Sequence, residues 1–372
     1  MTIGNAIRIL DVGGQTQLRV RQLRGHLWSP QYSPDGKRIA FVHDAGGRGQ
    51  IGVMAEDGLD ATNMSRNDYC DRSPVWSSDG RKIAFMSDRT GDWDIYCMNA
   101  DGSNQRRLAG NPGLDRAPAW SPDGGRLAWE SHFSGMPNIW VCDADGLNSR
   151  PLIAPDKPFS FVEMREGERN KTSKLVQVRP FFPDNTFHLE DPVWSPDGER
   201  IAAAGPSGAH TREIYHVAII RADGSRLLRT GNGLRSVSDL CWSPDGTRLA
   251  GSCRTTPVET ERSGIFVIRA DGTDGPLGHL LVNVSPQGPR LGGAIRHGLL
   301  TWYSHGSAQP RRVVKSFANL AWSPDGKILA FASDMDPTGA FYIYRISPEG
   351  GKPDRLEQTR SAWPQQIMWR PD

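Results

Sequence analysis

Short apolar runs separated by turn-forming residues recur along the chain, mostly at a spacing of about 44 residues. Each repeat opens with an aromatic residue, continues through Ser-Pro-Asp-Gly or a close variant, and enters a second apolar run. The opening aromatic residues are Tyr32, Trp76, Trp120, Trp194, Trp242 and Trp322, which lie 44, 44, 74, 48 and 80 residues apart. Self-similarity at such a period is typical of an architecture built from one repeated supersecondary unit.

The pattern inside one repeat predicts four short antiparallel strands. Proline sets φ for the first turn, Asp caps it and Gly accepts a positive φ, so the turn joins two strands into a hairpin. A third apolar run such as Ile139–Cys142 follows and ends at an Ala-Asp-Gly turn, before a short fourth strand. Four strands per repeat make the blade of a β-propeller. No stretch has a sustained period of 3.6 residues, and we therefore predict an all-β chain.

Both ends of the sequence predict how the ring closes. Ile7 lies 25 residues before Tyr32, as Ile51 does before Trp76, so Ile7–Leu18 would supply the third and fourth strands of a blade. The final Trp369-Arg370-Pro371-Asp372 resembles a repeat start and would supply its inner strand. We predict a single domain over residues 1–372 with seven four-stranded blades, closed by N-terminal strands plus a C-terminal strand. Six or eight blades are the alternatives; eight requires Val284–Leu291 to be a decayed repeat start.

The repeat also resembles a known family. The order W-S-P-D-G-x-x-I/L-A-F, then S-D-R-x-G-x-x-x-I-Y and A-D-G, is similar to the TolB-type propeller repeat, which is also found in the propeller domains of prolyl-oligopeptidase-like enzymes. Asp88-Arg89-Thr90-Gly91 with Ile95-Tyr96 is the fullest match. The resemblance implies a propeller and leaves the activity open, because such propellers host binding, scaffolding and catalysis. Neither the α/β domain of TolB nor a hydrolase domain is recognisable in the sequence.

Composition narrows the classes of partner. Lys and Arg number 44 against 42 Asp and Glu, and this near-balance argues against a nucleic-acid partner. No apolar run is long enough to span a membrane, and the N-terminus lacks the regions of a signal peptide. We therefore expect a cytoplasmic protein, with export of a processed form left open. Five cysteines without a CxxC pair favour buried, unpaired thiols over a catalytic one: Cys70, Cys97, Cys142, Cys241 and Cys253.

Strand order assigns the connections to two faces of the ring. First-to-second and third-to-fourth turns lie on one face, which we name the turn face. Second-to-third loops and blade-to-blade connections lie on the other, the mouth face. Two long insertions, at about 153–190 and 276–318, fall largely in blade-to-blade connections and would overhang the mouth face. We therefore expect the functional site at that face, around the central channel.

Residues of several chemical types are predicted to meet at the mouth face. The catalytic candidates are His132, Glu130, His188 and Glu190. The ligand-binding candidates are Arg72, Arg116, Asp71, Asp115, Asp239, Arg254, Trp28, Trp302, Trp363, His297 and His305. Glu130 occupies a repeat position that is otherwise apolar or small, so it is either ion-paired within the blades or a carboxyl with a shifted pKa. Asp71-Arg72 and Asp115-Arg116 are either mutual ion pairs or a site that recognises an anion or a sugar.

The remaining candidates also carry two interpretations each. Asp44, Asp88 and Asp334 recur at one repeat position and are expected to cap loop amides. Trp28, Trp302 and Trp363 lie outside the repeat register and are either stacking platforms or packing residues. The metal-ligand candidates are His26, His132 and His188, but the sequence contains no HxH or HExxH motif. A divalent metal is left open as a cofactor.

Three functions are consistent with this pattern. We favour a binding propeller that captures a small molecule or a peptide at the channel mouth. The alternative is an enzyme, a lyase, hydrolase or isomerase with or without a metal, acting on an anionic or saccharide-like substrate at the same mouth. His132 or His188 would then be the general base and Glu130 or Glu190 its partner. A scaffold that binds another protein through the turn face is the third.

Overall fold

We analysed a computed structural model of the chain. It describes residues 7–10, 16–20, 27–44, 46–110, 112–133, 137–153, 189–206, 215–225, 227–255, 263–273, 279–284, 294–296, 299–301, 317–335 and 340–361. Strands and turns form all the regular structure of these residues, and they contain no helix. The all-β prediction is confirmed for them.

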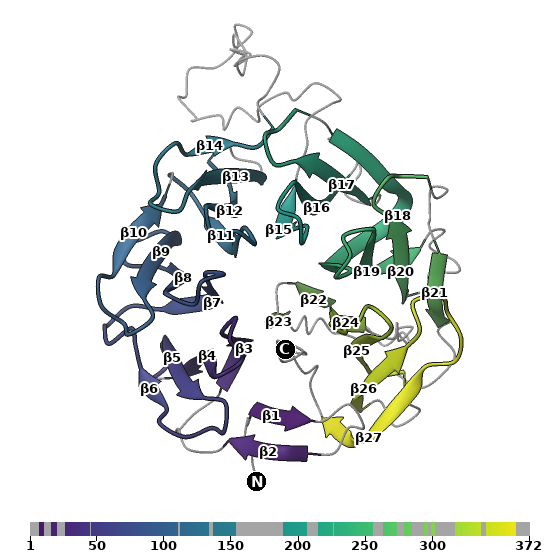
Figure 1. Cartoon of the computed structure of the whole chain (residues 1–372), viewed down its shortest axis with the longest axis horizontal. Coiled ribbons are helices and arrows are strands. Elements are labelled where there is room, and N and C mark those ends of the chain that lie inside the picture. The colour runs from purple at the N-terminus through teal and green to yellow at the C-terminus, as the bar shows by residue number, and fades with distance from the viewer. Residues whose placement is uncertain are drawn as a thin grey trace, which may run out of the picture.

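The strands form six four-stranded antiparallel blades around a central axis (Figure 1). Blade I comprises β3 (Leu27–Tyr32), β4 (Arg38–Asp44), β5 (Gly49–Ala55) and β6 (Thr62–Asn63). Blade II comprises β7 (Asp71–Trp76), β8 (Lys82–Ser87), β9 (Asp94–Asn99) and β10 (Arg106–Ala109). Blade III comprises β11 (Asp115–Trp120), β12 (Arg126–Ser131), β13 (Asn138–Asp143) and β14 (Arg150–Pro151).

One long strand joins the next two blades into a seven-stranded sheet. Blade IV comprises β15 (Glu190–Trp194), β16 (Arg200–Pro206), β17 (Tyr215–Arg221) and the first half of β18 (Leu227–Trp242). Blade V comprises the second half of β18, β19 (Arg248–Thr255), β20 (Ser263–Arg269) and β21 (His279–Val284). Blade VI comprises β24 (Phe317–Trp322), β25 (Leu329–Ser333), β26 (Phe341–Ile346) and β27 (Asp354–Ser361).

Two short hairpins complete the described strands. β1 (Ile7–Leu10) pairs with β2 (Thr16–Val20), and β22 (Ala294–Arg296) pairs with β23 (Leu299–Thr301). Figure 1 places β1 and β2 between blade VI and blade I.

The predicted count of seven blades is corrected to six, the lower of our alternatives. The N-terminal hairpin alone occupies the position of the predicted seventh blade, and two strands do not make a four-stranded sheet. Residues 362–372, which would add its inner strand, lie outside the described residues. Closure of the ring by the two chain ends therefore stays a prediction. The hypothetical eighth blade at 284–291 has no four-stranded counterpart among the described residues.

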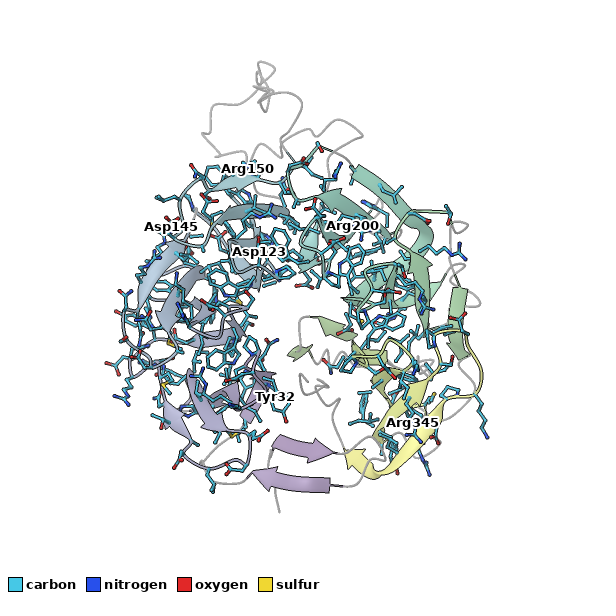
Figure 2. All side chains as sticks on the ribbon, in the orientation of Figure 1. Tyr32, Asp123, Asp145, Arg150, Arg200 and Arg345 are labelled. Carbon is cyan, nitrogen blue, oxygen red and sulfur yellow. The ribbon has the colours of Figure 1, made fainter. Side chains whose placement is uncertain are left out.

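The first turn of each blade is held by hydrogen bonds that its own sequence supplies. In blade II the Ser77 hydroxyl donates to Asp79 Oδ1 at 2.6 Å, and the Arg81 amide donates to the same oxygen at 3.0 Å. These donors favour the ionised form and lower the pKa of Asp79. Figure 2 shows the equivalent Asp123 of blade III closer to the axis than Asp145 of the second turn.

Neighbouring blades are joined by a repeated contact between an arginine and a tryptophan. Arg38 of blade I lies over the Trp76 ring of blade II, with its guanidinium carbon 4.6 Å from the ring centroid, and donates to Gly80 O at 3.1 Å. The Trp76 indole N–H donates back to Gln31 O of blade I at 3.2 Å. The same Arg–Trp pairs join the later blades: Arg126 with Trp194, Arg200 with Trp242, and Arg248 with Trp322. Cation–π attraction and burial of the rings hold the blades together.

The junction between blades II and III departs from this rule. Lys82 stands where blades I, III, IV and V carry arginine, and Trp120 Nε1 has no hydrogen-bond partner among the described residues. Trp120 still packs in the apolar cluster between the two blades, and Lys82 Nζ donates to Ala144 O of blade III at 3.5 Å, so the junction keeps its core and one polar contact without the Arg–Trp pair.

Candidate ligand site at the mouth face

Every inner strand carries a bulge near its mouth-face end, and this bulge builds the site. The bulged residue, three positions before the aromatic anchor, has a positive φ of 50–56° in all six blades: Ser29, Ser73, Ala117, Asp191, Asp239 and Asn319. The pairing register with the second strand shifts at each of these positions. Left-handed backbone is costly for non-glycine residues, and only Asp and Asn adopt it with ease. This ring of bulges is not recognisable from the sequence, since the bulged residue is not glycine in any blade and proline follows it in four.

The residue before each bulge forms a register pair with a residue of the second strand. These register pairs are Trp28–Val42, Arg72–Met86, Arg116–Glu130, Glu190–Ala204, Ser238–Ser252 and Ala318–Ala332. The turns and the aromatic anchors repeat from blade to blade, whereas the chemistry of this pair differs in every blade. Four of the predicted site residues, Trp28, Arg72, Arg116 and Glu190, occupy its inner-strand position.

Glu130 is the centre of a polar network at this face. Its side chain has no exposed surface, Oε1 accepts a hydrogen bond from Arg116 Nε at 2.7 Å, and Arg116 Nη2 lies 2.7 Å from the same oxygen in an ion pair. His132 Nε2 lies 2.8 Å from the same oxygen. Oε2 accepts the backbone N–H of Asp191, in the next blade, at 3.2 Å. Of the two interpretations of Glu130, the structure supports the ion pair within the blades.

Arg72 holds the position in blade II that Arg116 holds in blade III, but its surroundings differ. Its register partner is Met86, which carries no charge. The guanidinium carbon lies 5.3 Å from the centroid of the Trp93 ring. Arg72 Nε is buried and has no hydrogen-bond partner, and no described carboxylate forms an ion pair with the side chain.

Asp71, Arg72, Asp115 and Arg116 do not form ion pairs with their neighbours in sequence. Asp71 is fully buried and its Oδ2 accepts from Arg89 Nη2 at 3.1 Å and from Asn67 Nδ2 at 2.8 Å, not from Arg72. Arg116 likewise pairs with Glu130 and not with Asp115. The reason is that successive residues of a strand point to opposite faces of the sheet, so neighbours in sequence cannot meet.

Asp239 forms a second polar network, between blades V and VI. Its Oδ2 accepts from the Ser252 hydroxyl at 3.1 Å and from the Ser238 hydroxyl at 3.2 Å. Burial raises its pKa, and the nearby charge of Asp191 adds to this rise; hydrogen bonds from the Asn319 amide and the two serines act in the opposite direction. Asp239 therefore contacts the backbone of the following blade, as Glu130 does, with the same geometry of carboxylate to bulge amide.

The structure places the other predicted residues as follows. Trp28 packs against the apolar cluster between blades I and II, which supports its packing interpretation for the buried part of the ring. Arg254 is the penultimate residue of β19 and pairs in register with Ser236. Asp44 accepts the Gly47 amide at 2.6 Å and Asp88 accepts the Cys70 amide at 2.8 Å, so these two cap loops as predicted. His26, His188, His297, His305, Trp302 and Trp363 lie outside the described residues.

The described residues offer little support for a metal site or for a reactive thiol. The described residues contain no group of three or more His, Cys, Asp or Glu side chains arranged to hold a metal ion. Cys97, Cys142 and Cys253 are buried free thiols, and burial raises the pKa of Cys142 and of Cys253 to about 12. No helix long and apolar enough to cross a membrane occurs in the described ranges.

Comparison with known families identifies the repeat. Residues 3–163 match the family model described as TolB beta propeller domain, and residues 224–256 match the WD domain, G-beta repeat. The chain is a β-propeller, and residues 3–163 are similar to the TolB-type propeller family. The resemblance carried by the sequence is thus confirmed. A search of the curated proteins gave no match.

Solved structures with the same fold have diverse names. The β-propeller domain of Cps50 (Swd1) from Myceliophteria thermophila is 14% identical, with a TM-score of 0.55, and the alignment covers 99% of this chain and 92% of that one. Oligogalacturonate lyase from Vibrio parahaemolyticus is 13% identical, with a TM-score of 0.53 and coverages of 94% and 84%. TolB from Acinetobacter baumannii is 15% identical, with a TM-score of 0.50; the alignment covers 89% of this chain and 65% of TolB. At these identities the similarity shows the fold alone.

Proposed function

We propose that the protein is a binding propeller that captures a small molecule or a peptide segment at its mouth face. The ring of register pairs carries this proposal. Positions that pack the blades are repeated, but the inner-strand position before the bulge is Trp, Arg, Arg, Glu, Ser or Ala in the six blades. A ring that served packing alone would repeat this position too. Variation confined to one end of the inner strands supports recognition of a ligand without internal symmetry.

The charge of the chain favours a small ligand over a nucleic acid as its partner. The whole chain carries 44 basic and 42 acidic residues, so it lacks the basic excess that binds a phosphate backbone. At the mouth face itself Arg116 is neutralised by Glu130, and Arg72 remains without an ionic partner among the described residues. A guanidinium without a counter-ion suits a ligand that carries an acidic group.

A library of metabolites and short peptides, screened by thermal shift and confirmed by calorimetry, tests the proposal. The mouth variant combines Trp28→Ala, Arg72→Met and His132→Ala. The matched control combines Arg81→Met, Leu147→Ala and Lys327→Met, three exposed residues in turn-face connections. We expect the ligands found with the wild-type protein to bind the mouth variant at least tenfold more weakly and the control unchanged. Affinities that are the same in all three proteins would refute the proposal.

The second candidate function is an enzyme acting on an anionic saccharide. The observation that favours it is the Glu130–His132 contact of 2.8 Å at the mouth face, since a histidine held by a carboxylate is a common general base. The fold similarity to oligogalacturonate lyase adds an acidic saccharide as the substrate class to test. Turnover of oligogalacturonate, with and without added divalent metal, should then be lost in His132→Asn and in Glu190→Gln. If oligogalacturonate is not turned over under any metal condition, the enzyme hypothesis is excluded for that substrate.

A further inference from the structure

We infer that Arg72 is the anchor of the site, and that it binds an oxyanion, a carboxylate or phosphate group of the ligand, above the Trp93 ring. This inference rests on the proposed function and names the chemical class of the ligand group. It follows from one difference between two equivalent blades.

Blades II and III have the same residue type at the inner-strand position of the register pair, and only one of them has its counter-ion. Arg116 meets Glu130 through a hydrogen bond from Nε and an ion pair from Nη2, both at 2.7 Å, and Glu130 is completely buried. Arg72 has Met86 at the corresponding place. The backbone that presents both arginines is the same, with a left-handed bulge directly after each, at Ser73 and at Ala117. The blade therefore builds a carboxylate-binding position twice, and in blade II no acidic side chain of the described residues occupies it.

The nearest acid in the sequence does not neutralise Arg72. Oδ2 of Asp71 already accepts from Arg89 and Asn67, and Arg89 also donates to Gln105 Oε1 at 2.6 Å. Asp71 and Arg72, as successive strand residues, point to opposite faces of blade II. Arg89, which belongs to the Asp-Arg-Thr-Gly motif of the repeat, thus serves as the structural partner of Asp71 and leaves Arg72 out of this pair.

The geometry around Arg72 suits an oxyanion. The Arg72 guanidinium carbon lies over the Trp93 ring, 5.3 Å from its centroid, and this cation–π contact leaves the N–H groups available as donors. One of these groups, Nε–H, is buried without a partner among the described residues, and a buried donor without an acceptor is unfavourable. A carboxylate or phosphate that meets the edge of the guanidinium can accept from two of its N–H groups together.

Substitution of Met86 offers a test that keeps the fold. Met86→Glu gives blade II the acid that blade III has in Glu130, and the new side chain would occupy Arg72 from within the blade. Arg72→Met removes the cation with little change of volume. Arg81→Met is the control, because Arg81 is an exposed arginine of the turn-face connection with a side chain that is 85% accessible. Circular dichroism and melting temperature establish that each variant is folded.

The probes are inorganic phosphate and galacturonate, titrated at constant ionic strength and followed by calorimetry. They separate a tetrahedral oxyanion from a sugar carboxylate as the preferred group. We expect the wild-type protein and Arg81→Met to bind at least one of them saturably, and both Arg72→Met and Met86→Glu to bind it at least tenfold more weakly. Wild-type protein that binds neither probe, or variants that bind as wild type does, would overturn the inference.

Failure of this inference is distinguishable from failure of the proposed function. A ligand from the library that loses affinity in the triple mouth variant but keeps it in Arg72→Met and in Met86→Glu leaves the binding propeller standing and removes the anion anchor. A ligand insensitive to every mouth substitution removes both.

Discussion

Glu130 acts on two blades at once, because its two carboxylate oxygens have different partners. Oε1 serves Arg116 and His132 of its own blade, and Oε2 accepts the Asp191 amide at the bulge of the next. A carboxylate at this place therefore fixes the orientation of two candidate ligand contacts and the position of the following inner strand. Its role is positioning, and it stabilises the site before any ligand binds.

Glu130→Gln is expected to lower the free energy of unfolding by about 2–4 kcal/mol. The substitution leaves the Arg116 guanidinium buried beside a neutral group, and the loss of a buried partner costs more than the net strength of the pair. Glu199→Gln, at an exposed glutamate 4.0 Å from Arg221, is the control and should change stability by less than about 0.5 kcal/mol. Urea unfolding measures both. Equal stability of Glu130→Gln and wild type would show that the network contributes nothing.

His43 gives a pH dependence of known sign. Burial is the main cause that lowers its pKa below the ordinary value of 6.5, while a hydrogen bond with Asn63 acts in the opposite direction. The unfolded chain therefore protonates His43 at a higher pH than the folded chain does. Its contribution to stability is complete above about pH 6.5 and is lost as the pH falls from there through the lowered folded pKa. The turn aspartates such as Asp79, whose pKa is also lowered, act in a separate and more acidic range.

Comparison of wild type with His43→Gln isolates this effect. Both proteins are unfolded by urea at about pH 7.5 and at about pH 5.5, on either side of the ordinary histidine pKa. We expect wild type to lose more stability between the two pH values than the variant does, since Gln cannot take up the proton. The same loss in both would mean that His43 titrates alike in the folded and unfolded chain.

At the scale of the element, the blade junctions follow one rule with one exception. An arginine of one blade covers the anchor tryptophan of the next at four junctions, with the guanidinium carbon 4.6–5.1 Å from the ring centroid. Between blades II and III, Lys82 replaces the arginine and Trp120 Nε1 is left without an acceptor. The ammonium group of lysine is compact. It lacks the planar guanidinium with which arginine covers the tryptophan ring and also donates to a carbonyl of the turn.

Lys82→Arg should therefore raise the free energy of unfolding by about 0.5–1 kcal/mol. The reverse change, Arg126→Lys at the junction of blades III and IV, should lower it by a similar amount, because it removes both the contact with Trp194 and the hydrogen bond to Gly198 O. Urea unfolding of the two variants and their parent measures the pair. If Lys82→Arg is neutral while Arg126→Lys destabilises, the II–III junction differs by more than the identity of one cation.

The blade could be predicted from the sequence because its first hairpin is formed by residues that lie close together in the chain. Ser77, Asp79 and Gly80 make their turn with each other, and Trp76 lies at a fixed distance from that turn, so a repeat of ten residues defines a hairpin. The mouth face was predicted less well. The acceptor of Arg116 and the donor to Glu130 Oε2 come from different strands and blades, and no spacing encodes them. The ring of bulges was not predicted, because serine and alanine, which occupy three of its positions, are not typical of left-handed backbone.

At the scale of the whole molecule, the boundary between blade VI and blade I differs from the four junctions that have an Arg–Trp contact. Neither half of the Arg–Trp contact is present there: Ile328 stands at the arginine position of blade VI, and Tyr32 replaces the anchor tryptophan of blade I. The face of blade I that does not meet blade II still presents an apolar cluster with Leu27, Ile39 and Phe41. The β1–β2 hairpin lies between these two blades in Figure 1. Blades VI and I thus lack the contact by which direct neighbours pack.

Trp369→Ala tests whether the end of the chain completes this boundary. Trp369 opens the last repeat-like segment, and the described anchors at the same repeat position, such as Trp76, are buried between blades. If Trp369 packs like them, its removal should lower the free energy of unfolding by about 3–5 kcal/mol, as Trp76→Ala should. If residues 362–372 form the predicted inner strand, their deletion should lower the melting temperature further, since it removes that strand together with the indole ring. Trp369→Ala with wild-type stability, beside a strongly destabilised Trp76→Ala, would leave six blades and an N-terminal hairpin as the complete packing unit.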